Sequence, residues 1–249
     1  MPAQTIDHVI QQLEDIVDWS KRHESRLGYF AALYRKVTIS VKKGIASGFF
    51  EDGKRLERLD VVFAKRYIMA FEQYRSNQKT TRSWQLAFET SKHWWPIVLQ
   101  HLLLGMNAHI NLDLGIAAAQ TSPGDRLPSL KNDFDKINEI LAALVDGVQQ
   151  ELARIWPLLG LLDRIGGRTD EALINFNMRK ARDKAWKVAQ ELAPIDQAKQ
   201  MSAIDQIDKE VARFGRVVRH PGPLVGAVNK IIRLGERGKV PQIIDTLNG

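Results

Sequence analysis

The stretch "QHLLLGMNAHINLDLGIAA", residues 100–118, decides the fold because it reads as a helix that is apolar on almost every side. Such a helix has no face to present to water, so it belongs at the centre of a core with other helices packed around it. The same stretch nevertheless carries five polar residues, His101, Asn107, His109, Asn111 and Asp113. Each needs a partner, since an unpartnered buried polar group costs about 2 kcal/mol or more.

Apolar residues recur with helical spacing on both sides of this central segment. Near the start, Ile6, Val9, Leu13 and Ile16 repeat at intervals of three and four, which is typical of an amphipathic helix. No run shows the strict alternation of a half-buried strand. We therefore predict an all-α fold, a single compact domain of about ten helices around the buried helix at 96–119. The other helices after the first are expected near 26–46, 54–75, 81–92, 130–157, 170–192, 203–218, 223–236 and 240–247.

A loop-forming segment, "QTSPGDRLPSL" at 120–130, divides the chain. We expect residues 1–120 to form an N-terminal helical half that holds the candidate site. Residues 121–249 form a C-terminal half, packed with the first as one domain. In this second half, Thr169 and Ser202 are predicted to be helix N-caps.

Composition excludes several classes of chemistry. The chain has no cysteine, which removes disulfides, thiolate nucleophiles and cysteine-based zinc or iron–sulfur sites. Its first residues lack the basic and apolar regions of a secretory signal, so we expect a cytoplasmic protein. Residues 97–119 are long enough to span a bilayer, but the repeated His, Asn and Asp argue against a transmembrane segment.

Charge bears on the class of partner. There are 36 basic and 29 acidic residues, with a net charge of +7, and the two signs are interspersed along the chain. This pattern disfavours nucleic acid and leaves open a small-molecule ligand or, more weakly, a membrane surface. The segment "NFNMRKARDKAW" at 175–186 is strongly basic on one side, and we expect that side to be a solvated face.

The polar residues of the central helix suggest a site. His109 and Asp113 are four residues apart, so they share one face and can bind one metal ion or hydrogen-bond to each other. Asp60 and Tyr67 enter the apolar stripe of a second predicted helix, and Tyr34 enters that of a third. We predict that these three helices enclose a buried polar pocket.

Each candidate residue receives a role. We predict catalytic roles for His109, Asp113, Asp60, Tyr67 and His101, and ligand-binding roles for Tyr34, Arg66 and Asn107. Asn107 points almost away from His109 around the helix, so it also suits a contact that holds a neighbouring helix.

Three interpretations of this cluster remain open. In the first, His109, Asp113 and Asp60 bind a divalent zinc, iron or manganese ion, as in a metal-dependent hydrolase or lyase. In the second, they form a buried hydrogen-bond network in which Arg35 or Arg66 balances the charge of Asp113. In the third, the pocket holds a small molecule without a metal.

The chain also resembles a known family. Four motifs carry the likeness: "LYRKVT" (33–38), "LDVVFAKRY" (59–67), "QHLLLGMNAHINLDLG" (100–115) and "ARDKAW" (181–186). They are similar to a bacterial family of helical proteins known only as a domain of unknown function. The resemblance implies an all-α fold and no activity. It also implies a signature made of Asp60, Arg66, Tyr67, Asn107, His109 and Asp113.

Two functions from different classes follow. The first is a pocket protein, an enzyme in its stronger form, that holds or acts on a small, partly apolar molecule. The second is a non-catalytic scaffold or membrane-surface protein that uses a basic C-terminal face. That face contains Lys209, Arg213, Arg216 and Arg219, which lie close together around one predicted helix.

Overall fold

The computed structural model describes residues 3–155 and 178–249, which form helices and no strand, so the predicted all-α class is confirmed. Four helices precede the central segment: α1 (Ile6–Arg22), α2 (Gly28–Ala46), α3 (Gly53–Arg75) and α4 (Arg82–Ser91). The central segment comprises α5 (Val98–Ala108), η1 (His109–Leu114) and α6 (Gly115–Thr121). The remaining elements are η2 (Gly124–Leu130), α7 (Lys131–Ile155), α10 (Met178–Leu192), η3 (Gln197–Lys199), α11 (Met201–Arg219), α12 (Pro223–Gly235) and α13 (Val240–Asn248).

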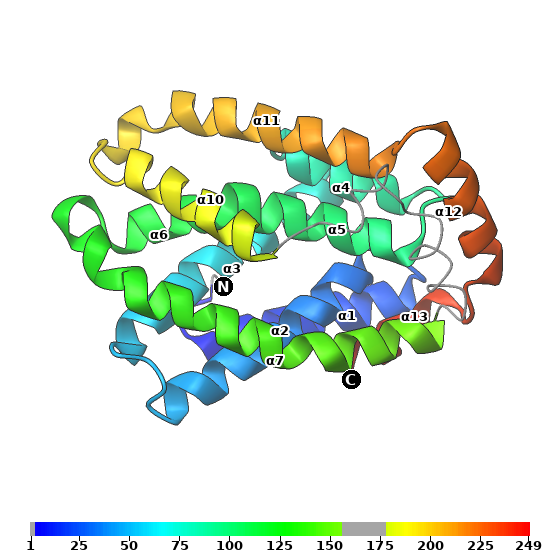
Figure 1. The fold of residues 1–249 in the computed structure, drawn as a ribbon, viewed down its shortest axis with the longest axis horizontal. Helices are drawn as coiled ribbons and strands as arrows, with labels where there is room; N and C mark the ends of the chain where they lie inside the picture. The colour runs from blue at the N-terminus through cyan, green and yellow to red at the C-terminus, as the bar shows by residue number, and fades with distance from the viewer. Residues whose placement is uncertain (1–2, 156–177) are drawn as a thin grey trace.

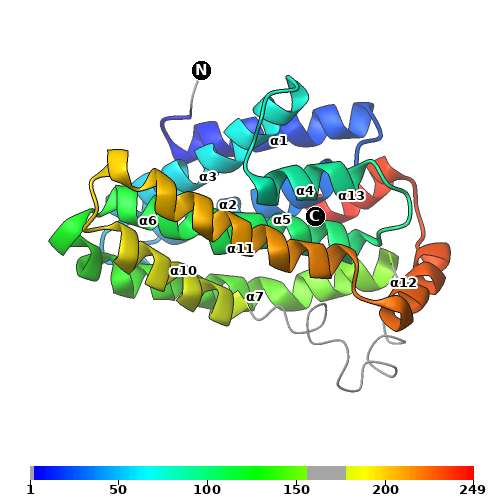
Figure 2. The ribbon, with the colours of Figure 1, turned by 90° about the horizontal axis from the view of Figure 1, so that it is seen from above.

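The central segment is one continuous rod, as the sequence predicts. It runs between α10 and α11 on one side and α2 and α7 on the other (Figure 1), and it contacts α2, α3, α4, α10 and α11. Figure 2 shows the same rod from above, with α7 and α10 on one side and α1 and α3 on the opposite side. By length and composition Val98–Thr121 could cross a membrane, but 89% of its most apolar window is buried inside the protein. Its neighbours therefore supply the apolar surroundings that its sequence requires.

Two glycines let the rod pack closely. A Cβ atom at Gly105 would lie 2.5 Å from the ring of Phe30, on α2. A Cβ atom at Gly115 would lie 2.6 Å from the backbone oxygen of Ala185, on α10. These distances are too short for any side chain, so glycine is what allows α2 and α10 to approach the rod from opposite sides.

The observed helices follow the predicted ranges, with two differences. The central helix contains a π-helical turn, η1, that the sequence did not predict. Ser202 lies inside α11, whose N-cap is Gln200, so the predicted cap at Ser202 is wrong. The Gln200 side chain is buried and donates to the backbone oxygens of Leu192 and Ile195, which fixes an earlier helix start. The predicted cap at Thr169 lies outside the described residues.

A buried carboxylate fixes α3 against α7, and so positions one wall of the site. Asp133, in the first turn of α7, accepts hydrogen bonds from the backbone N–H groups of Glu51 and Asp52 at 2.7 and 2.9 Å. Its Oδ2 also accepts from Arg55 at 3.3 Å. The Asp133 carboxylate thus satisfies two backbone N–H groups just before α3, whose own N-cap is Asp52.

Candidate functional site

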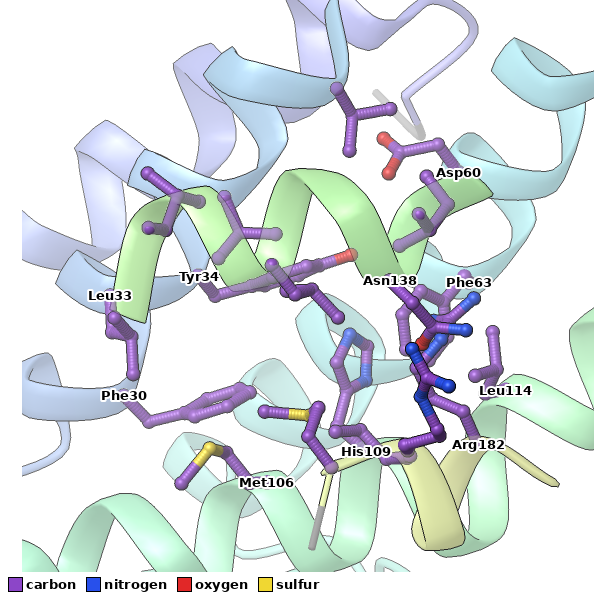
Figure 3. Close-up of a pocket in the computed structure, with 18 of the residues that line it drawn as sticks. Phe30, Leu33, Tyr34, Asp60, Phe63, Met106, His109, Leu114, Asn138 and Arg182 are labelled. Carbon is purple, nitrogen blue, oxygen red and sulfur yellow. The ribbon is translucent and has the colours of Figure 1, made fainter. Parts of the chain in front are cut away.

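A cavity of about 560 Å³ lies beside the central rod. Its volume is in the range of small-molecule sites, about 300–1,000 Å³. Side chains of α2, α3, α5, η1, α7 and α10 line it (Figure 3), so both halves of the chain contribute, and not only the predicted N-terminal half. Most of the lining is aliphatic or aromatic; the polar lining residues are Tyr34, Asp60, His109, Asn138, Arg179 and Arg182.

His109 is the first residue of η1 and faces this cavity (Figure 3). Its imidazole stacks on the ring of Phe63, with centroids 3.5 Å apart and an angle of 9° between the planes. The Tyr34 ring meets it edge-on at 4.4 Å. Burial lowers the pKa of His109 despite the nearby carboxylate of Asp113, so the imidazole is neutral at pH 7. Neither ring nitrogen has a hydrogen-bond partner among the described residues.

Asp113 lies behind His109 and does not line the cavity. Its Oδ1 accepts from Arg66 Nε at 2.7 Å, and its Oδ2 accepts from Trp84 Nε1 at 2.8 Å. The same Oδ2 is 3.5 Å from Nδ1 of His109. Burial alone would raise the pKa of Asp113, but the charge of Arg66, the nearby imidazole of His109 and the donor from Trp84 more than offset it, so the pKa lies below its ordinary value.

The arginine that balances Asp113 is therefore Arg66, one of the two candidates that the sequence offered. The other, Arg35, pairs with Glu14 and donates to Asn248. Arg66 does not line the cavity, so it contacts the site through Asp113.

Tyr34 and Asp60 reach the cavity from α2 and α3, as predicted. The hydroxyl of Tyr34 and Oδ2 of Asp60 are both buried without a hydrogen-bond partner among the described residues. Burial, with a smaller contribution from Glu57, raises the pKa of Asp60 to about 7. Asp60 therefore holds its proton through most of the acidic range and can donate a hydrogen bond to a bound molecule.

Arg182 is buried in the cavity wall, contrary to the prediction from the sequence. The basic segment 175–186 was expected to be solvated on its charged side, yet Arg182 is only 5% exposed and lines the cavity. Its Nη2 donates to the backbone oxygen of Phe134 at 2.5 Å, and its guanidinium lies 4.5 Å from the Phe134 ring. Its Nε has no partner among the described residues. Burial lowers the pKa of Arg182 to about 10, which leaves it charged at neutral pH.

Two predicted catalytic residues are buried elsewhere. His101 is not in the cavity lining and packs against the edge of Tyr29, with centroids 5.8 Å apart. Burial lowers its pKa to about 3, so it stays neutral. Tyr67 also lies outside the lining, with its ring 5.0 Å from that of Trp84. Its buried hydroxyl has no partner within the described part of the chain.

Asn107 has the structural role that its position around the helix indicates. Its Nδ2 donates to the backbone oxygen of Val211 at 2.9 Å, which joins α5 to α11. Its Oδ1 accepts from Asn111, one turn further along, at 3.0 Å. Asn107 does not line the cavity, so its position there does not support the predicted ligand-binding role.

The three predicted metal ligands do not form a metal centre. Over residues 3–155 and 178–249, no group of three or more His, Asp or Glu side chains could hold a metal ion. Both oxygens of Asp113 are already occupied by Arg66 and Trp84. This geometry favours the network interpretation for Asp113 and a metal-free pocket for His109 and Asp60.

The fold and the cavity define a helical protein with a mostly apolar cavity beside a neutral histidine. Comparison with known proteins gives the family: residues 6–221 match the model of the family of unknown function DUF5995, and the chain belongs to that family. No curated protein and no solved structure gave a match to the chain.

Replacing Asp113 by Asn should destabilise the protein by about 3 kcal/mol, because Arg66 loses its counter-charge in a mostly buried position. The folded-state pKa is lowered, so the stability that Asp113 contributes is present above its unfolded pKa and is lost as the pH falls through the folded value. Urea denaturation at pH 7 and at pH 3 measures both effects. Asp7→Asn, in an exposed pair with Lys42, is the control that should change little. Equal stability of the Asp113 variant and the wild type would contradict this prediction.

Replacing Asp60 by Asn should stabilise the protein above pH 7. The folded-state pKa of Asp60 is raised from 3.8 to about 7, so the unfolded chain ionises first and stability falls as the pH rises from about 4 to about 7. The neutral amide removes this loss, which is on the order of 2 to 4 kcal/mol. Urea denaturation from pH 4 to 8 should show a flatter profile for the variant. Parallel profiles for the two proteins would show that Asp60 does not titrate in this way.

Proposed function

We propose that this protein binds a small, mostly apolar molecule in the cavity beside His109. The observation that carries the proposal is a set of buried polar atoms around one apolar space that have no hydrogen-bond partner among the described residues: Tyr34 Oη, Asp60 Oδ2, Nε2 of His109, and Arg182 Nε. Buried polar atoms in proteins nearly always have a partner, so each exception calls for an explanation. A ligand with a few polar groups supplies partners to all of them at once.

His109 is the residue through which this site would do chemistry. Its imidazole is neutral, lies against the cavity and is held by stacking on Phe63. Asp113 stands behind it at 3.5 Å, itself fixed by Arg66 and Trp84. A neutral imidazole backed by an oriented carboxylate is the arrangement of a general base, because the carboxylate stabilises the protonated ring. We assign to His109 the acceptance of a proton from a bound molecule.

Binding of a neutral fluorescent probe tests the pocket. N-phenyl-1-naphthylamine should bind the wild type saturably, with a rise and blue shift of its emission, because the lining is mostly apolar. Leu141→Trp should weaken binding about tenfold or more, since the added ring fills the cavity from the partly exposed α7 wall.

The matched control is Leu234→Trp, which adds the same ring on an exposed side of α12. It should leave probe binding unchanged. Absence of saturable binding to the wild type, or equal binding by the two tryptophan variants, would show that the cavity is not the site.

A second function, docking on an anionic membrane surface, is favoured by the outer face of α12. Leu224, Ile231 and Leu234 are spaced seven and three residues apart, so they share this face, and they are 53–72% exposed. Trp94 and Trp95 are about half exposed beside the same helix. Their rings lie against cations of α12, Arg233 for Trp94 and Lys230 for Trp95.

The charged residues in and around α12 are mostly basic. Residues 211–239 contain seven basic residues and one acidic residue, Glu236, which pairs with Arg233 at 2.5 Å. Lys209 of the predicted basic face is exposed but pairs with Asp205, whereas Arg213 and Arg216 are exposed further along the same helix. Exposed leucine, isoleucine and tryptophan flanked by basic side chains suit the interface of an anionic bilayer.

Vesicle sedimentation tests this second function. The protein should bind phosphatidylserine-containing vesicles more strongly than pure phosphatidylcholine vesicles, and added salt should weaken the binding, because exposed charges are screened. Ile231→Glu should remove most of it. Met69→Glu is the control, since Met69 is 59% exposed on α3, away from this face. Equal sedimentation of the Ile231 and Met69 variants would overturn the membrane proposal, and His109→Gln should leave vesicle binding unchanged.

A further inference from the structure

We infer that the molecule bound in the cavity is an apolar compound ending in a single carboxylate, and that Arg182 binds this carboxylate. The inference rests on the proposed small-molecule function and names the chemical class of its ligand. It depends on how the charge of Arg182 is balanced, on the direction of its donors and on the apolar remainder of the cavity.

Arg182 is a buried cation without an ion-pair partner in the described part of the chain. The nearby acids Asp135 and Asp183 raise its pKa through space, but burial outweighs them. Asp135 pairs with Lys131 instead. A buried arginine is normally paired, because an isolated charge is costly to remove from water.

The protein uses only part of the donor capacity of Arg182. Nη2 donates to the backbone oxygen of Phe134, and the Phe134 ring covers one face of the guanidinium. Nε is left without a partner, and the group lies at the same end of the cavity as Asn138 and His109 (Figure 3). A guanidinium presents its donors in a planar fork that matches the two oxygens of a carboxylate.

The charge count favours a carboxylate over other groups. A neutral ligand would leave the buried cation unbalanced, and a dianionic phosphate ester would exceed the one buried positive charge. Arg179, the next basic residue of the lining, is exposed and already solvated. A monoanion therefore matches the single buried cation.

The rest of the lining accounts for the apolar part of the ligand. Beyond Arg182 the walls are built from residues such as Phe30, Leu33, Val37, Leu59 and Met106. Of the other polar lining groups, Tyr34, Asn138 and the neutral His109 carry no charge, and neither does Asp60 while it holds its proton. The aliphatic or aromatic part of the ligand is thus stabilised by burial, while its carboxylate binds Arg182.

Competition with the neutral probe tests this inference. At pH 6, where Asp60 still holds its proton and dodecanoate is ionised, dodecanoate should displace N-phenyl-1-naphthylamine from the wild type at a concentration about tenfold or more below that of dodecanol, because a charge-assisted hydrogen bond is added. Arg182→Met should abolish this preference and still bind the probe. Arg179→Met, the matched control on the same helix, should retain it. Arg182→Lys, which keeps the charge without the fork, should retain part of it.

Each other outcome has a definite meaning. Equal displacement by dodecanol and dodecanoate would overturn the anionic ligand while leaving the proposed pocket intact. A preference that survives in Arg182→Met would remove Arg182 as the binding group. Stronger displacement by dodecyl phosphate than by dodecanoate would overturn the carboxylate. If neither the probe nor dodecanoate binds, as checked by the shift of the thermal unfolding midpoint, both proposals fail together.

Discussion

The buried contact of Asp113 with Arg66 and Trp84 is the constraint on which the site depends. An apolar rod packed among apolar helices can rotate or slide at small cost, because its contacts are not directional. A carboxylate that must accept from α3 and from α4 at the same time has one acceptable position. This contact fixes the rotation of η1, and the same rotation places His109 against the cavity.

The fold was predictable because its determinants are local or nearly so. Helical periodicity and the lack of strand patterns gave the helices, and the uniform apolarity of 100–118 gave the central position. An unpaired buried carboxylate is costly, so the sequence also predicted that an arginine lies close to Asp113. Asn107 was predictable for the same reason, because its angle around the helix pointed toward a neighbouring helix and not toward His109.

The remainder of the site was not predictable because it depends on packing between distant segments. A basic amphipathic segment has the same pattern whether its charged side meets water or a cavity, so nothing in 175–186 showed that Arg182 is buried. The π-turn of η1, which begins at His109 and includes Asp113, has no simple sequence signal. His101 and Tyr67 are polar residues on apolar helices, and only the structure shows that their positions are outside the cavity.

A structural network does not account for the cavity, because this protein satisfies its buried carboxylates elsewhere. Asp133 accepts from two backbone N–H groups and from Arg55. Asp208 accepts from the backbone at the start of α4 and from the hydroxyl of Ser83. Asp60 is also buried, but its Oδ2 has no donor among the described residues, and burial raises its pKa. A buried polar atom without a partner costs free energy in the empty protein. Such atoms are therefore typical of positions that serve binding rather than stability. Tyr34, His109 and Arg182 also carry buried polar atoms that lack a partner among the described residues, and all four residues line the same cavity.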